Sequence, residues 1–193
     1  EGSVVSQEQF QTNQTDFKAI LTNIKAVGPD VIFAPSSIVT APLIIKQARE
    51  LGITATIMGG DTWENATIIE NAGADSEGVV LSTFFDEADP ATAEAESFVK
   101  GFKEYLVANN QPDIIPAVSA LGYDAYLAIL TAIKNADSVD PNAIRDALVT
   151  TEFDGVTGHI SFDENGDANK DMAFIKVVED GQFKFLKTVT VAE

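Results

Sequence analysis

The chain of 193 residues has no cysteine, few basic residues and a single histidine. The missing cysteine excludes disulfides, thiol nucleophiles and cysteine-ligated metals, but it fits an oxidising and a reducing compartment equally well. Twelve Lys and Arg residues against 30 Asp and Glu residues give a formal net charge of −18. Because nucleic acid and anionic membranes repel a field of that sign, we expect no nucleic-acid partner, although solubility alone accounts for most of these charges.

Long apolar runs and a leader segment are also missing. We find no apolar run near the ~20 residues that span a bilayer, and no signal peptide at the start, Glu1-Gly-Ser-Val-Val. The protein is therefore expected to be cytosolic, or the chain has lost its original beginning. With 45% hydrophobic and 22% charged residues, the composition is that of an ordinary folded protein with one domain or two small ones.

The first 85 residues alternate between short apolar runs and amphipathic segments. Strands are expected at residues 4–10, 30–34, 54–58 and 77–84, and helices at 17–26, 40–51 and 62–71. Asp16 is the expected N-cap of the first helix, and the apolar run 30–34 is typical of a buried parallel strand. This β-α repetition predicts an α/β fold in which a parallel sheet with right-handed crossovers is flanked by helices.

The pattern changes after Phe85. An acidic connector leads to three expected helices, at residues 91–109, 118–135 and 141–150. Asp140 is the expected N-cap of the last one, with Pro141 at its first position. No strand of a central sheet lies between these apolar-faced helices, so they either pack on one another or cover a sheet built from residues outside this chain.

The end of the chain returns to β-structure. We expect a strand at 156–162, a tight turn at 163–167, and a hairpin formed by residues 172–178 and 183–191. The hairpin is predicted to turn at Asp180-Gly181 in the type I′ conformation, which needs positive φ angles. An α/β unit that is interrupted in this way predicts two lobes joined by several hinge strands.

Signals for catalysis or metal binding are weak. A Ser-His-Asp triad needs the only histidine, His159, in a cleft, and a solvated or edge-strand histidine is the favoured interpretation. The 163–167 turn superficially resembles a calcium loop, but Gly166 is fourth instead of sixth and Phe174 stands where the twelfth-position Glu belongs. Neither a metal nor a cofactor is expected. Paired carboxylates for glycoside hydrolysis stay an alternative in so acidic a chain, although no aromatic cluster indicates a sugar subsite.

The best candidate for a site is the segment 54–64. Gly59-Gly60 ends a strand, and Asp61 stands at the mouth of the next expected helix. In open parallel sheets, small ligands bind at the carboxyl ends of the strands. Asp61 with Glu64 three residues later also fits a variant of the capping box. Asp61 is therefore a helix cap, a ligand contact or both.

Residues 35–38 and 60–63 end two neighbouring strands, so their side chains are expected to meet at one edge of the sheet. The candidate ligand-binding residues there are Ser36, Ser37, Asp61, Thr62 and Trp63. Ser37 offers a hydroxyl and Asp61 a charge for a cation. Trp63 has enough apolar surface to line a pocket, but anchoring of the following helix in the core is the favoured interpretation.

Several short motifs together resemble the solute-binding proteins of branched-chain amino acid ABC transporters. They occur in the family's order and spacing over nearly the whole chain: Asp16-Phe17, Gly28-Pro29-Asp30-Val-Ile-Phe, Lys46-Gln47-Ala48-Arg49-Glu50-Leu51-Gly52-Ile53, Met58-Gly-Gly-Asp61-Thr-Trp63, Gly73, Glu77-Gly78-Val, Gly122-Tyr123-Asp124-Ala125 and Phe162-Asp-Glu-Asn-Gly166-Asp. No single motif is specific, but the combination is. The resemblance implies the type I periplasmic-binding-protein (flytrap) fold, in which two α/β lobes joined by three crossovers close over an amino acid without catalysis.

The resemblance also implies that this chain is the C-terminal part of such a protein. Residues 1–85 are then the β/α part of lobe two, 86–165 a helical return into lobe one, and 166–193 a C-terminal hairpin back in lobe two. The implied partners are a small amino acid, the membrane permease of the transporter and the N-terminal half of the same protein. The implied location is periplasmic or extracellular, and a lipid anchor on the full-length protein is compatible with it.

In this family an acidic residue after the Met-Gly motif takes the ammonium of the ligand, and Asp61 matches it. Aromatic residues are common in the family where this chain has Ser37 and Val118, so the side-chain preference stays open, with room for a different or larger ligand. Two alternatives remain. The same lobes serve as ligand-sensing domains of receptors and regulators, and an α/β hydrolase-type enzyme would use Asp61 as an acid or base.

Overall fold

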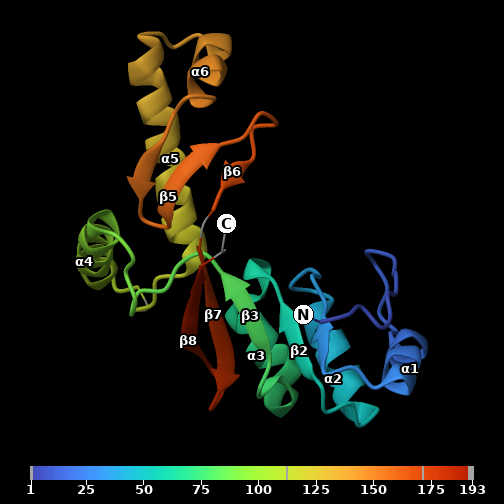
Figure 1. The fold of residues 1–193 in the computed structure, drawn as a ribbon. Helices are drawn as coiled ribbons and strands as arrows, with labels where there is room; N and C mark the ends of the chain where they lie inside the picture. Colours follow the sequence, from blue (N-terminus) through green and yellow to red (C-terminus); the bar gives the residue numbers. More distant parts are fainter. Residues whose placement is uncertain (1, 112, 171, 191–193) are drawn as a thin grey trace. The chain divides into compact units, whose positions relative to one another are not determined.

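The computed structural model describes residues 2–111, 113–170 and 172–190 (Figure 1). The chain divides into two compact units: unit 1 comprises residues 1–83 and 175–187, and unit 2 comprises residues 84–174 and 188–193. The chain therefore passes between the units after residues 83, 174 and 187.

Unit 1 is built on a five-stranded sheet with the order β1-β2-β3-β7-β8. The strands are β1 (Val31–Phe33), β2 (Thr56–Gly59), β3 (Val80–Thr83), β7 (Met172–Glu179) and β8 (Gln182–Thr190). β1, β2 and β3 run parallel, with Ile32 opposite Ile57 and Met58 opposite Val80. The predicted parallel β/α arrangement is confirmed for these three strands, and the β7–β8 hairpin extends the sheet.

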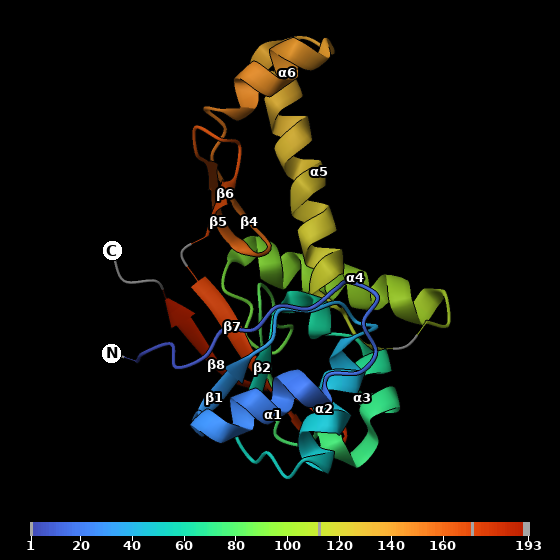
Figure 2. The same ribbon diagram turned by 90° about the vertical axis from the view of Figure 1, so that its right-hand side faces the viewer.

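Three helices cover one face of this sheet (Figure 2): α1 (Lys18–Val27), α2 (Ala41–Glu50) and α3 (Ala66–Ala72). Two 3₁₀ turns, η1 (Asp61–Trp63) and η2 (Gly73–Ser76), flank α3. Alternate strand residues and one helix face form a single core, which contains Leu21, Ile32, Ile45, Ile57, Ile68 and Leu81. Each such side chain stabilises the fold by about 1.5–3 kcal/mol on burial.

Three details at the start of unit 1 differ from the predictions. Residues 4–10 form no strand, since only two adjacent valines and one distant phenylalanine supply apolar surface. β1 is an edge strand with alternating burial, and Phe33 is 62% exposed, so the prediction of a fully buried strand is wrong. The N-cap of α1 is Phe17, although the Asp16 carboxylate accepts a hydrogen bond from the Lys18 N–H at 3.0 Å.

The hairpin turn of unit 1 is confirmed. Asp180 and Gly181 have φ angles of 55° and 68°, as a type I′ turn requires. The carboxylate of Glu77 accepts hydrogen bonds from both turn N–H groups, at 3.1 and 2.7 Å. This carboxylate therefore ties the turn to the segment just before β3.

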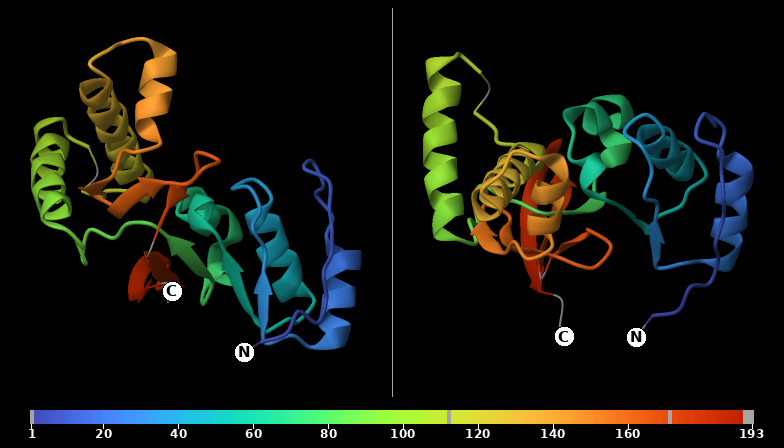
Figure 3. Two further views of the ribbon diagram at one scale, coloured as in Figure 1. Left: turned by 45° about the horizontal axis from the view of Figure 1, so that its top comes forward. Right: turned by 90° about the horizontal axis from the view of Figure 1, so that it is seen from above.

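Unit 2 contains the three predicted helices, α4 (Ala93–Ala108), α5 (Ala117–Ala136) and α6 (Pro141–Leu148). Asp140 caps α6 as predicted, because its carboxylate accepts from the N–H groups of Asn142 and Ala143. α6 packs against α5, and α4 crosses α5 steeply (Figures 2 and 3). A small antiparallel sheet follows, made of β4 (Phe153–Gly155), β5 (Gly158–Phe162) and β6 (Ala168–Asn169). Of its strands, only β5 was predicted.

The core of unit 2 joins α4, α5 and the loop after β4 through residues such as Phe85, Phe98, Ala120 and Val156. α5 has 20 residues and is, by length and composition alone, apolar enough to cross a membrane, so the expectation that no run reaches that length is wrong. Its middle nevertheless carries the buried Asp124, whose carboxylate is satisfied by residues 156 and 157. That arrangement is typical of a helix packed inside a folded unit.

Candidate functional site

Two loops meet where β1 and β2 end, and we call residues 34–37 and 60–63 the strand-end loops. The Ala34 N–H donates to the carbonyl of Met58 at 2.8 Å. The indole Nε1 of Trp63 donates to the carbonyl of Ser36 at 2.9 Å, and the Thr62 hydroxyl lies 3.4 Å from the same oxygen. The structure therefore brings Ser36, Thr62 and Trp63 together where the two parallel strands end.

Trp63 is fully buried in the core of unit 1, which confirms the packing interpretation. Its ring lies directly over Gly59, where an added Cβ would be 2.0 Å from the indole Cδ2. Gly59 is therefore required by the close approach of the indole to the backbone. The Gly59-Gly60 pair therefore ends the strand, and the missing side chain of Gly59 leaves room for the Trp63 indole that anchors the second loop.

Asp61 begins the 3₁₀ turn η1, and its side chain is half-buried. Among the residues that the structure describes, none forms a hydrogen bond or ion pair with its carboxylate. The capping role predicted for Asp61 is wrong, because α3 begins only at Ala66 and is capped by Asn65, whose side chain accepts from the Thr67 N–H at 2.9 Å. The 61–63 turn delays the helix because Trp63 must first reach its position over Gly59.

The two serines differ in accessibility. Ser36 is buried, and its Oγ is the one fully buried side-chain polar atom without a partner among the described residues. Ser37 is exposed, and its hydroxyl lies 3.2 Å from that of Thr40 at the start of α2. In this conformation Ser37 and Thr62 present hydroxyls at the surface, whereas Ser36 contributes its backbone carbonyl to Trp63 and Thr62.

Sequence reasoning missed a buried ion pair that is formed by a residue three positions after Asp61. Glu64 pairs with Lys176 of β7, and the side chains are only 10% and 8% exposed, respectively. The second carboxylate oxygen of Glu64 accepts from the Thr83 hydroxyl at 2.8 Å. The two charged residues are 112 positions apart, so no local pattern indicates the pair.

Val118 belongs to the first turn of α5 in unit 2, where it is 67% exposed. Its part in a ligand site stays a prediction.

His159 and the 163–167 turn, the candidates for catalysis and metal binding, make local contacts that belong to the fold. His159 is exposed on β5, and its Nδ1 lies 2.9 Å from Asp154 on the paired strand β4. The 163–167 turn is confirmed, because Asp163 Oδ1 accepts from the Asn165 and Asp167 N–H groups, and the latter bond lowers the pKa of Asp163. Within the described ranges no group of three or more His, Asp or Glu side chains is arranged to hold a metal.

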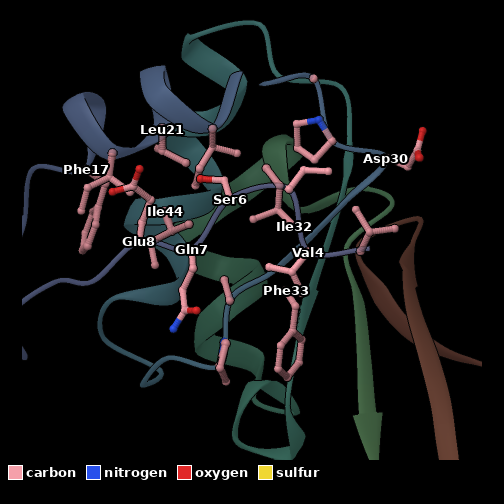
Figure 4. A pocket seen from close by; sticks show the side chains of 18 of the residues that line it. Val4, Ser6, Gln7, Glu8, Phe17, Leu21, Asp30, Ile32, Phe33 and Ile44 are labelled. Atoms are coloured by element: carbon pink, nitrogen blue, oxygen red, sulfur yellow. The ribbon is translucent and has the colours of Figure 1, made fainter. Parts of the chain in front are cut away.

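A cavity of about 990 Å³ lies elsewhere in unit 1, between residues 2–8, α1 and β1 (Figure 4). Phe17, Leu21 and Ile32 line its apolar side, and Gln7 and Glu8 lie on the covering segment. Neither Asp61 nor Ser37 contributes to it. It occupies the space that residues 4–10 leave beside β1 because they do not pair as a strand.

Comparison with known proteins places these features in a family. A model described as "Periplasmic binding protein" matches residues 1–182. The Leu-, Ile-, Val-, Thr- and Ala-binding protein of Pseudomonas aeruginosa is 29% identical over 162 residues, which are 83% of this chain and 41% of that protein. The leucine-binding protein LivK of Thermotoga maritima superposes with a TM-score of 0.81 at 33% identity, over 94% of this chain and 50% of that one.

The isoleucine complex of the branched-chain amino acid transporter binding protein LivJ from Streptococcus pneumoniae superposes with a TM-score of 0.76 at 29% identity, over 99% of this chain and 53% of that chain. The chain thus spans about half the length of the relatives it matches. These relatives are solute-binding proteins and not enzymes, so the hydrolase interpretation is wrong. With its type I periplasmic-binding-protein fold and a family model matched from residue 1 to 182, the chain belongs to the periplasmic binding protein family.

Proposed function

We propose that the chain is part of the substrate-binding component of an ABC transporter, which captures a small amino acid between two lobes for uptake. The proposal is supported by relatives named for binding leucine, isoleucine and valine. It places the protein in the periplasm or outside the cell, with a membrane permease as its partner. LivJ is described as the substrate-binding protein of a transporter, which favours transport over the sensor role of receptors and regulators.

The observation that carries the proposal is the carboxylate of Asp61. It is half-buried at the carboxyl end of β2, and no described residue neutralises it. A partly desolvated carboxylate without a partner is costly, and an ammonium that hydrogen-bonds to it offsets that cost. An amino acid brings such an ammonium to the same edge of the sheet where α/β folds bind small ligands.

The other residues of the strand-end loops take different roles in this proposal. Ser37 and Thr62, on the same two loops as Asp61, present exposed hydroxyls and contact the ligand. Trp63 and Ser36 hold the two loops together without contacting the ligand, because the hydrogen bond from the indole to the Ser36 carbonyl fixes one loop to the other. Ser37 is small compared with the aromatic ring common in the family at this position, so the ligand's side chain is the least defined part of the proposal, and the titration covers all natural amino acids.

The test is isothermal titration calorimetry of the full-length protein with L-isoleucine, followed by the other natural amino acids. Asp61→Asn is expected to weaken binding about 10- to 100-fold, which corresponds to the loss of one charged hydrogen bond. Asp30→Asn is the matched control, because Asp30 stands at the opposite, amino end of β1. Its affinity should equal that of the unmodified protein.

Two results would contradict the proposal at different levels. Equal affinities of Asp61→Asn and the unmodified protein would show that Asp61 does not hold the ammonium. Absence of heat with every amino acid, for a protein that is folded by circular dichroism, would show that the ligand belongs to another class.

A further inference from the structure

We propose that Glu64 and Lys176 are positioning residues for Asp61: their buried ion pair fixes the turn that carries the ligand-binding carboxylate to strand β7. This inference rests on the proposed function, because it concerns how the ammonium-binding group is held. We call residues 60–64 the Asp61 turn.

The Asp61 turn has few means of holding its own shape. It follows Gly59-Gly60, and its helical part is the three-residue turn η1. Within it, the Glu64 N–H donates to the Asp61 carbonyl at 3.0 Å, and the Trp63 N–H to the Gly60 carbonyl at 3.0 Å. Asp61 is therefore coupled through the backbone to Glu64, although its own side chain makes no bond with any residue that the structure describes.

Two side chains fix the turn to the sheet from different directions. Trp63 bonds to the Ser36 carbonyl after β1. Glu64 bonds to Thr83 at the end of β3 and to Lys176 on β7. Because a buried, hydrogen-bonded ion pair defines the position of both partners, this second anchor orients the backbone at Asp61 from the side that Trp63 does not reach.

The pair also determines the charge at the turn. Residues 60–64 contain two acids, Asp61 and Glu64. Lys176 neutralises Glu64 in a site from which water is nearly excluded, so a single negative charge is left for a ligand. That single charge matches a ligand group with one ammonium. The need to neutralise Glu64 gives a reason for the burial of Lys176.

A double-mutant cycle on the full-length protein tests the positioning role, with L-isoleucine as the probe and calorimetric affinity as the readout. If Lys176 holds the Asp61 turn, Asp61→Asn should lower the affinity for L-isoleucine about 10- to 100-fold in the unmodified protein. In a Lys176→Met background the same change should lower the affinity less than about 5-fold. Lys176→Arg, which keeps the charge, should restore most of the Asp61 contribution. Thr83→Val removes only one bond to Glu64 and should give an intermediate coupling if Lys176→Met does not fold.

Leu21→Ala is the control for loss of stability alone. Leu21 is buried in the same core, on α1 and outside the Asp61 turn. Its effect should add to that of Asp61→Asn without coupling, because a purely structural role lowers stability and leaves the contact with the ammonium intact. Equal effects of Asp61→Asn with and without Lys176 would overturn the inference while leaving the proposed function in place. No effect of Asp61→Asn in the unmodified protein would overturn both.

Discussion

Glu64 in unit 1 and Asp124 in unit 2 are both buried carboxylates, but they are held in different ways. Glu64 pairs with the ammonium of Lys176, which comes from a distant strand, and accepts one hydroxyl bond. Asp124 accepts three bonds from neutral donors, the Val156 and Thr157 N–H groups and the Thr157 hydroxyl, at 2.6–2.8 Å. Unit 1 thus stabilises its buried charge with a countercharge, and unit 2 does so with dipoles from one short loop.

The comparison explains why Asp61 differs from both. Both oxygens of Glu64 and both oxygens of Asp124 already have partners inside the protein, so these carboxylates serve the fold. Asp61 is half-buried near Glu64 and has no such partner among the described residues. The candidate for ligand binding is therefore the carboxylate that the fold leaves unsatisfied, and not the most buried one.

The largest effect is expected when the countercharge is removed. Lys176→Met leaves Glu64 buried and unpaired, and it should lower the free energy of unfolding of unit 1 by about 3–5 kcal/mol. The double variant Glu64→Leu/Lys176→Met should recover much of this loss, since an apolar pair of similar volume replaces the ion pair without an unpaired charge. Urea titration followed by tryptophan fluorescence measures the free energy of unfolding of each variant, because Trp63, the only tryptophan of this chain, lies in the core of unit 1.

Asp61→Ala is the matched control within the same turn. It removes a carboxylate without a described partner or a capping role, so the free energy of unfolding should change by no more than about 0.5 kcal/mol. A loss as large as that of Lys176→Met would show that Asp61, like Glu64, belongs to the buried structure.

The same contrast shows what the sequence could and could not predict. The parallel strands, the three long helices after Phe85 and the Asp180-Gly181 turn follow from local periodicity and turn chemistry, which act over a few residues. Asp61 was found because it ends a strand of a predicted parallel sheet. The Glu64–Lys176 pair could not be found, because only the folded sheet brings β7 beside the segments that precede it in the chain.

The capping error has a local cause as well. Asp61 and Glu64 fit a capping pattern, and so does Asn65, which the structure uses. What decides between them is the packing of Trp63 over Gly59, a contact that depends on the shape of the core. Tertiary packing therefore moved the helix start to Ala66.

A smaller effect is expected when a side chain is added to a closely packed glycine, Gly59 in unit 1 or Gly155 in unit 2. In Gly59→Ala the new Cβ would meet the Trp63 indole, and in Gly155→Ala it would lie 2.6 Å from Asp124 Oδ1. Each should lose about 1–3 kcal/mol of stability by overpacking. Trp63 fluorescence should report the first change, and near-ultraviolet circular dichroism of the tyrosines, all three of which lie in unit 2, should report the second.

Each unit offers a glycine with open space as a control. An added Cβ at Gly60 or at Gly122 of α5 meets no atom within 4 Å. Gly60→Ala should be nearly neutral, and Gly122→Ala should stabilise α5 by about 0.5–1 kcal/mol because alanine is the better helix former. Equal losses at Gly59 and Gly60 would mean that the indole does not fix the strand-end loops.

The smallest effect on stability is expected from another neutral donor of unit 2, the Tyr123 hydroxyl, whose contribution depends on pH. The Tyr123 hydroxyl donates to the Glu94 carboxylate at 3.1 Å, and this bond, with some burial, raises the pKa of Tyr123 above its usual value. Because the folded state holds the phenol proton more tightly, the contribution to stability is fully present below the unfolded pKa of about 10 and is lost as the pH rises through the folded pKa. Glu94→Gln should lower the pKa of Tyr123 toward that usual value, as measured by ¹³C NMR of labelled tyrosine. Glu96→Gln, also in the first turn of α4, should leave it raised, and equal titration in both variants would contradict the assigned cause.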